Sequence, residues 1–230
     1  MKKQLKHEQS AQDDIKIIMS EGSYYFAFDT ETGGLLPKEA DILTFYGAIL
    51  DEDFKLIDEI NLKLKPDGRL PQAHADALRV NGINLQEHLA DPETITYSDA
   101  KVKIVTLLKK YLKKRGRYSN IRPLGQNVQF DLEFTWEHII PRAEWDSIVH
   151  YGKIDTKLIV DFLKDSGWFP RDLGSLGSVV DYLQIAKRNA HNAKEDTLMT
   201  VDVYKKLVEI MKSKKENSGG QDLISLLEAE

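Results

Sequence analysis

The hydrophobic pattern of this chain begins with strand-like apolar runs and continues with short runs that alternate with segments of helical spacing. An acidic turn at 51–53 separates two of the early runs and predicts a hairpin. The pattern predicts strands over residues 24–29, 42–50, 54–64, 122–127 and 152–155, and helices over residues 73–80, 97–114, 130–140, 156–164, 173–183 and 193–212. Strands first, then strands alternating with helices, indicate an α/β protein with a mixed sheet flanked by helices.

Length and composition fit one domain with appendages. A chain of 230 residues with 41% hydrophobic content can bury a sizeable core. We expect an N-terminal arm over residues 1–21, a folded domain over 22–212, and a linker and tail over 213–230. No stretch approaches the roughly 20 apolar residues of a membrane span, and the Met-Lys-Lys start lacks the apolar run of a signal peptide. A cytoplasmic location is therefore expected, and the absence of cysteine is compatible with it.

The first predicted strand ends in two carboxylates, Asp29 and Glu31, followed by the glycines Gly33 and Gly34. Side chains two residues apart on a strand project from the same face, so the carboxylates would stand side by side. The glycines would let a substrate approach the backbone closely. This arrangement is typical of a divalent-cation site for phosphate chemistry, and the alternative is a strand that leads into a polar turn.

Two later segments add candidate residues. A short strand turning into a helix is predicted around Asp131, which would lie near the start of the helix. Further on, Asn192 can cap the last predicted helix, with Glu195 in the capping-box position. His191 would then lie just outside that helix and Asp196 about one turn inside it, so that both can face the same point in space.

These segments resemble the three exonuclease motifs of the DEDD family, in the subgroup whose last motif is His-x4-Asp. DTETGG, GQNVQFD and HNAKED occur in the family's order, and the segments 153–156 and 196–200 are also similar to the family's sequences. The resemblance covers about residues 22–212. It implies a ribonuclease H-like fold with a five-stranded mixed sheet whose second strand is antiparallel. It also implies a 3′–5′ exonuclease that releases nucleoside 5′-monophosphates.

The resemblance assigns a role to each acidic residue. One divalent cation would be bound by three carboxylates, those of Asp29, Glu31 and Asp196. Asp29 would bridge to a second cation, which Asp131 would support directly or through water. His191 would be the general base.

Contacts to the substrate are implied as well. The backbone of Thr32 and Gly33 would meet the 3′-terminal nucleotide, and Asn127 would lie near the backbone phosphates. Leu35 or Leu36 would press on the last base, although a buried position in the loop is the more common role for such leucines.

The residue types themselves favour Mg²⁺ or Mn²⁺. Two carboxylates about 4 Å apart repel by about 4 kcal/mol at an effective dielectric near 20, so a cluster of them is costly without cations. All-oxygen ligation suits these two ions, and the lack of cysteine excludes a thiolate zinc site. Two ions about 3.5–4 Å apart can stabilise both the attacking and the leaving oxygen of a phosphoryl displacement. A histidine, with an unperturbed pKa near 6.5, can accept the proton of the attacking water.

The charge distribution is uneven. The net charge is −5, yet segment 101–117 contains eight cationic residues and no acidic one. Its apolar residues follow a helical period, which leaves a basic outer face that could track a phosphate backbone. The alternative is an ordinary solvated helix face.

The substrate class stays open at this point. No residue is identified that must meet a 2′-hydroxyl, the group that distinguishes RNA from DNA. Overall resemblance to the proofreading and single-strand-DNA members of the family favours single-stranded DNA or a DNA primer end, with RNA or oligoribonucleotide trimming as the alternative. Two other classes are less favoured: a phosphohydrolase of small nucleotides and a non-catalytic nucleic-acid-binding module. A non-catalytic module would be expected to have lost one or more acidic metal ligands, and none is missing here.

The C-terminal residues offer a possible partner site. Residues 221–227 follow a polar linker and form a short apolar patch. They loosely resemble the glutamine-plus-leucine peptides by which replication proteins dock on the sliding clamp. The preferred alternative is a short helix that packs back on the domain.

Overall fold

One mixed sheet organises the computed structural model, which describes residues 22–188 and 192–217. Its strand order is β4-β3-β2-β1-β5-β6. The six strands are β1 (Tyr24–Thr32), β2 (Ile42–Leu50), β3 (Leu56–Lys65), β4 (Thr94–Thr96), β5 (Ile121–Gly125) and β6 (Ile154–Asp155). β2 runs antiparallel to both neighbours, whereas β5 is parallel to β1 and to β6. The antiparallel second strand confirms the prediction.

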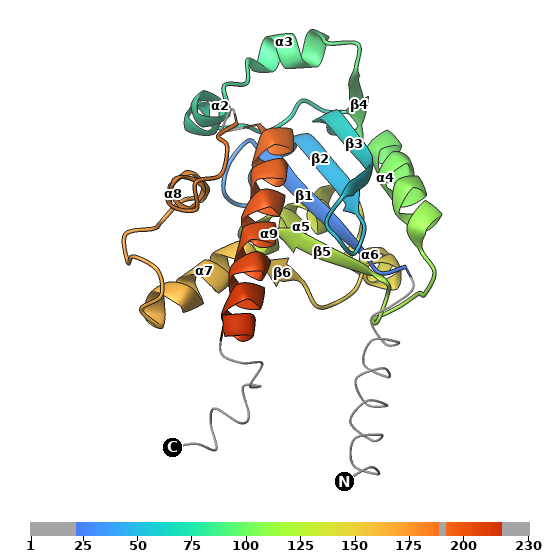
Figure 1. Cartoon of the computed structure of the whole chain (residues 1–230). Helices are drawn as coiled ribbons and strands as arrows, with labels where there is room; N and C mark the ends of the chain where they lie inside the picture. The colour runs from blue at the N-terminus through green and yellow to red at the C-terminus, as the bar shows by residue number, and fades with distance from the viewer. Residues whose placement is uncertain (1–21, 189–191, 218–230) are drawn as a thin grey trace.

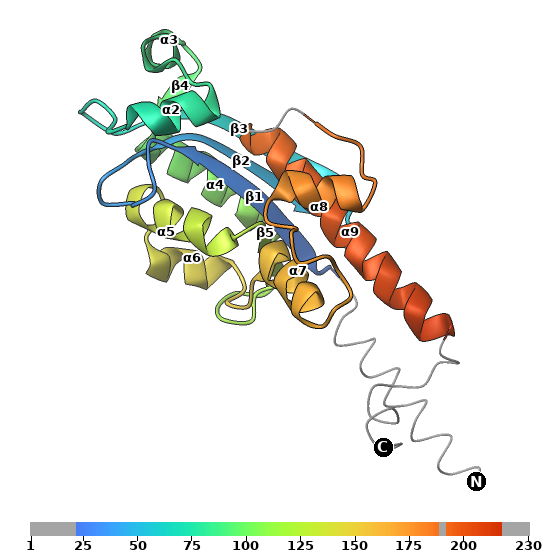
Figure 2. The same ribbon diagram turned by 90° about the vertical axis from the view of Figure 1, so that its left-hand side faces the viewer.

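Helices cover both faces of the sheet (Figures 1 and 2). Their bounds are α2 (Ala75–Asn81), α3 (Leu85–Ala90), α4 (Tyr97–Tyr111), α5 (Val128–His138), α6 (Arg142–Ile148), α7 (Thr156–Asp165), α8 (Leu176–Tyr182) and α9 (Ala193–Asn217). α4, α5 and α6 lie on one face, and α9 lies on the other with α8 beside it (Figure 2).

β1 is a central strand between β2 and β5, and both of its faces are buried because helices pack on each side of the sheet. Phe26 and Phe28 point towards α4–α6, where the ring of Phe28 lies 5.5 Å from that of Trp145 between centroids. Ala27 points to the other face and packs in a cluster with Val201 of α9. This two-sided burial explains why the strand reads as a continuous apolar run rather than as an alternation.

The predicted number of five strands is wrong, since β4 adds a sixth. β4 pairs with β3 over only three residues, two of them threonine, and such a short segment carries no detectable hydrophobic period. The short helices α3 and α6 were also absent from the predicted layout. Each has fewer residues than are needed to show a helical period.

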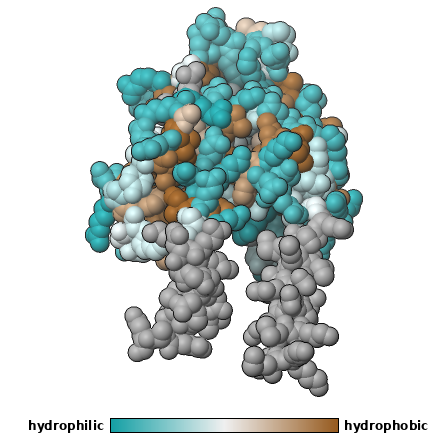
Figure 3. All heavy atoms as spheres, viewed as in Figure 1, coloured by the Kyte–Doolittle hydropathy of each residue, from teal (hydrophilic) through white to brown (hydrophobic). Residues whose placement is uncertain are grey.

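α9 continues to Asn217, past the predicted end at residue 212. Lysine and glutamate dominate this extension, and both are strong helix formers, so a polar segment expected as linker is helical here. The outer surface of α9 is mainly hydrophilic, with hydrophobic residues visible on both sides of it (Figure 3). None of the helices within residues 22–188 and 192–217 is long and apolar enough to cross a membrane.

Candidate active site

The alternation of β1 determines where its carboxylates point. Tyr25 and Ala27 face α9, so Asp29 and Glu31, two and four residues further on, project from the same face. The core therefore directs the two carboxylates towards the helix that carries the last acidic motif.

The start of α9 is fixed by a cap and by an ion pair. The side chain of Asn192 accepts hydrogen bonds from the N–H groups of Lys194 at 3.1 Å and Glu195 at 3.4 Å, which confirms the predicted cap. Lys194 Nζ also lies 2.8 Å from a carboxylate oxygen of Glu59 on β3. Asp196 is in the first turn of the helix, so these contacts position it over the sheet.

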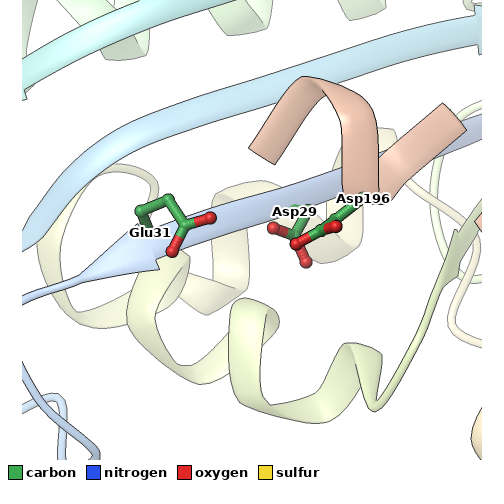
Figure 4. A group of neighbouring side chains, drawn as sticks. All are labelled: Asp29, Glu31 and Asp196. Carbon is green, nitrogen blue, oxygen red and sulfur yellow. The ribbon is translucent and has the colours of Figure 1, made fainter. Parts of the chain in front are cut away.

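Three carboxylates meet at this point. One oxygen each from Asp29, Glu31 and Asp196 lies within 4.8 Å of the others, and all three residues are partly buried. Figure 4 shows Asp29 and Asp196 next to each other, with Glu31 further along the same strand. These are the three carboxylates to which the resemblance assigns one cation, and that role stays a prediction.

Asp131 lies beside this group, in the first turn of α5. Its Oδ1 accepts hydrogen bonds from the N–H of Thr30 at 2.9 Å and from the Thr30 hydroxyl at 2.7 Å. Thr30 is on the opposite face of β1 from Asp29, so the strand itself holds the third motif in place. No feature of the sequence identified Thr30 as the residue that orients Asp131.

The electrostatics of the group show that negative charge is crowded. Burial, together with the charges of Asp131, Glu31 and Asp196, raises the pKa of Asp29 well above its ordinary value. Burial and the charge of Asp196 raise the pKa of Glu31 to about 7. Burial also raises the pKa of Asp131 to about 7, although both hydrogen bonds from Thr30 act in the opposite direction.

This crowding fits divalent cations. Three converging carboxylate oxygens form an all-oxygen donor set suited to Mg²⁺ or Mn²⁺. The cations would neutralise the repulsion that raises the carboxyl pKa values. The residues that would hold them are Asp29, Glu31 and Asp196, with Asp131 adjacent.

The raised pKa values predict that the metal-free protein loses stability as the pH rises. Between about pH 4, where such carboxyls ionise in an unfolded chain, and about pH 7, the folded protein binds more protons than the unfolded one. The free energy of unfolding therefore falls across this window, and Mg²⁺ should restore it most at the upper end. Thermal melts with EDTA or Mg²⁺ at several pH values measure both effects. A metal-free melting temperature that rises with pH in this window would contradict the expectation.

The glycine turn after Glu31 packs closely against the segment 72–74. A Cβ at Gly33 would lie 2.4 Å from the carbonyl oxygen of Gln72, and one at Gly34 would lie 2.7 Å from the ring of His74. The N–H of His74 also donates to the carbonyl of Gly33 at 2.7 Å. The two glycines are thus required by contacts within the protein, in addition to any approach of a substrate.

Asp41, which has no counterpart among the predicted site residues, fixes this turn. Its carboxylate is fully buried and accepts hydrogen bonds from two nitrogens of Arg69, at 2.6 and 2.8 Å, and from the N–H of Gln72 at 2.6 Å. Burial would raise the pKa of Asp41, but these hydrogen bonds and the charge of Arg69 lower it overall. Its backbone carbonyl accepts from Gly33 N–H at 2.7 Å.

Asp41→Asn should therefore lower the free energy of unfolding by about 2–3 kcal/mol, since an amide accepts on one oxygen only and leaves Arg69 without its charged partner. Chemical denaturation measures the change. Asp76→Asn is the matched control, because the Asp76–Arg79 pair is exposed on both sides and should contribute little. Equal stabilities of the two variants would show that Asp41 does not hold the turn.

A cleft of about 780 Å³ opens next to the carboxylates. Glu31 and Thr32 of β1 and Phe130 of α5 line it, and α2 supplies Ala77, Val80 and Asn81. The side chain of Asn81 donates to the carbonyl of Thr32 at 2.9 Å, which joins the two walls. The sequence did not identify the α2 residues as part of a site, because this helix carries no catalytic motif.

Leu35 and Leu36 also line this cleft and are 82% and 55% exposed, so the expectation of buried loop leucines is wrong. The turn carries them outwards, since the two preceding glycines are fixed against segment 72–74. Their contact with a terminal base stays a prediction.

Asn127 has a left-handed backbone, with φ of 57°, and its N–H donates to a carboxylate oxygen of Asp155 at 2.8 Å. Asp155 also caps α7 through the N–H of Lys157. The Ile-Asp-Thr segment thus fixes the β5–α5 turn. The Asn127 side chain is exposed, and its contact with phosphates stays a prediction. His191 lies outside the described residues, so its role as base also stays a prediction.

In sequence, the chain is similar to the PolC-type DNA polymerase III of Thermotoga petrophila, with 26% identity over 194 residues. That match covers 84% of this chain and 12% of the polymerase. No protein-family model matches the chain.

In structure, the chain resembles exonuclease I, with a TM-score of 0.61 and 23% identity over 80% of this chain and 40% of the exonuclease. The E. coli enzyme in complex with a dT13 oligonucleotide gives a TM-score of 0.61, with 20% identity over 86% of this chain and 43% of that one. A complex of ExoI with SSB-Ct gives a TM-score of 0.61, with 22% identity over 81% of this chain and 41% of the ExoI chain. This chain therefore spans less than half of these proteins.

The match to exonuclease I confirms the ribonuclease H-like fold and the predicted resemblance to exonucleases. The His-x4-Asp subgroup stays a prediction, because one of its two defining residues lies outside the described part of the chain.

Proposed function

We propose that this chain is a divalent-metal-dependent 3′–5′ exonuclease that acts on single-stranded DNA or a DNA primer end and releases nucleoside 5′-monophosphates. The observation that carries the proposal is the convergence of carboxylate oxygens from Asp29, Glu31 and Asp196 within 4.8 Å beside an open cleft. The similarity to exonuclease I and to a DNA polymerase supports nucleic acid as the substrate.

Each part of the site has a role in phosphodiester hydrolysis. Asp29, Glu31 and Asp196, with Asp131 beside them, would hold two cations, which supply charge stabilisation to the attacking and leaving oxygens. Thr32 and Gly34 line the cleft, so the 3′-terminal nucleotide would lie against the Thr32–Gly33 turn. His191 would accept the proton of the attacking water.

DNA is favoured over RNA because the structurally similar exonuclease I binds DNA oligonucleotides such as dT13. RNA trimming stays the alternative, since no described residue is assigned to a 2′-hydroxyl. The ExoI complex with SSB-Ct suggests replication proteins as possible partners of this chain. The docking tail proposed for residues 221–227 lies outside the described residues and stays a prediction.

The deciding experiment uses matched 5′-labelled DNA and RNA oligomers with the purified full chain. EDTA should abolish turnover, and Mg²⁺ or Mn²⁺ should restore it, with products that shorten from the 3′ end. Zn²⁺ belongs in the series, because a zinc-bound form of the E. coli exonuclease I complex with single-stranded DNA is known. Turnover of mononucleotide esters with none of either polymer would instead indicate a small-nucleotide phosphohydrolase.

A further inference from the structure

A cationic surface lies at the end of the sheet opposite the carboxylates. Segment 109–122 contains seven lysine and arginine residues and no acidic residue. Across residues 22–188 and 192–217, an ion-pair partner is found only for Lys110, which lies 2.8 Å from Asp58. The other six cations carry charge without a carboxylate partner in this part of the protein.

Exposed aromatic rings lie among these cations. Tyr118 and Tyr151 are 57% and 54% exposed, and their rings are nearly perpendicular with centroids 5.7 Å apart. His150 stacks on Tyr151 at 4.9 Å. The guanidinium of Arg117 lies 4.4 Å from the centre of the Tyr151 ring. We call this group, together with Lys114 and Arg115, the distal patch.

Backbone hydrogen bonds fix the two loops that form the distal patch. Tyr151 N–H donates to the carbonyl of Arg117 at 3.2 Å, and Gly116 N–H donates to the carbonyl of Ser147 at 3.0 Å. His150 N–H donates to Ile121 on β5 at 2.7 Å. The rings and cations are therefore held in a defined arrangement, which lowers the entropy cost of binding a ligand.

This combination of side chains suits single-stranded nucleic acid. Unpaired arginine and lysine side chains bind phosphates, and exposed aromatic rings stack on bases regardless of sequence. An acidic peptide would pair with the cations but has no bases to stack on the exposed rings of Tyr118 and Tyr151. The net charge of −5 also means that this positive surface is local rather than general.

Side chains and loops connect the distal patch to the carboxylate site along the β5–β6 edge. Gln129, in the same turn of α5 as Asp131, accepts a hydrogen bond from Lys153. Arg122 donates to the carbonyl of Gly152 at 3.2 Å, directly after Tyr151. The loop that precedes β5 lies at the far end of the sheet from α2 (Figures 1 and 2). β1 runs between the two ends over about 20 Å at the usual rise of a strand.

We propose that the distal patch is a second binding site for the single-stranded part of the nucleic acid whose 3′ end lies at the carboxylates. This inference rests on the proposed exonuclease function and extends it. A strand long enough to reach both sites is held at two points, whereas a short oligomer contacts only the carboxylate end. Long substrates are then bound more tightly without any change at the reacting bond.

The test is the double variant Arg117→Glu/Tyr118→Ala in the full chain. For DNA of about 25 nucleotides, KM should rise about tenfold or more, and the salt dependence of binding should become weaker. Turnover of oligomers of about four nucleotides should stay at the wild-type level. Lys103→Glu is the control, because it makes the same charge reversal on the exposed side of α4 outside the distal patch. If the melting temperature of the double variant is clearly below that of the wild type, the single variant Tyr118→Ala replaces it in the same measurements.

Binding of fluorescent DNA in EDTA provides a readout independent of catalysis. If the wild type cleaves neither length, the proposed function fails, while this measurement still tests the distal patch. Equal affinity of wild type and double variant for long DNA overturns the inference. Binding of an acidic peptide that is lost in the double variant would in that case assign the surface to a protein partner.

Discussion

Asp29→Asn is expected to lower turnover of a labelled oligomer by about 10³-fold or more, because it removes the charge at the centre of the three converging carboxylates. Charge stabilisation by bound cations contributes several kcal/mol, and each 1.36 kcal/mol corresponds to a factor of ten in rate. The amide keeps the size of the side chain, so the loss reports on charge rather than on packing. Single-turnover assays with saturating Mg²⁺ measure it.

The same variant should not destabilise the metal-free protein. Burial and the neighbouring carboxylates raise the pKa of Asp29, so a neutral amide avoids both the cost of burying a charge and the repulsion in the folded state. Melting in EDTA should therefore give a temperature equal to or above that of the wild type. Asp53→Asn in the exposed β2–β3 turn is the control for loss of one negative charge. Full activity of Asp29→Asn would exclude the carboxylate cluster as the catalytic centre.

His191→Ala is expected to lower the rate of the chemical step by about 10²–10⁴-fold, the usual contribution of a general base. Affinity for the oligomer should change little, because a proton acceptor acts in the transition state and contributes little to ground-state binding. Single-turnover rates and equilibrium binding of the same labelled oligomer separate the two quantities.

Asn192→Ala is the matched control for this experiment. It removes the hydrogen bonds to the N–H groups of Lys194 and Glu195 and should cost about 1 kcal/mol of stability. If both variants lose rate equally, a loosened start of α9 explains the effect. If His191→Ala weakens binding strongly and keeps its single-turnover rate, His191 is a binding residue.

Local sequence determined the parts of the site that depend on neighbours in the chain. The spacing of Asp29 and Glu31 on a strand places both on one face, and Asn192 caps the helix that carries Asp196. These features follow from strand and helix geometry, so they could be predicted. The number of strands could not, because β4 is too short to show a period and forms only by pairing with β3.

Tertiary structure decided the contacts between residues that are distant in the chain. Thr30 holds Asp131 across 101 residues, and Arg69 reaches Asp41 across 28. Packing also brought Tyr151 beside Arg117, so that the basic loop after α4 forms a patch of rings and cations with the loop before β6. Hydrophobic periodicity specifies which face of an element is buried, but not which polar groups of other elements lie beside it. Those neighbours depend on which strands and helices lie side by side, and only the complete fold defines that spatial order.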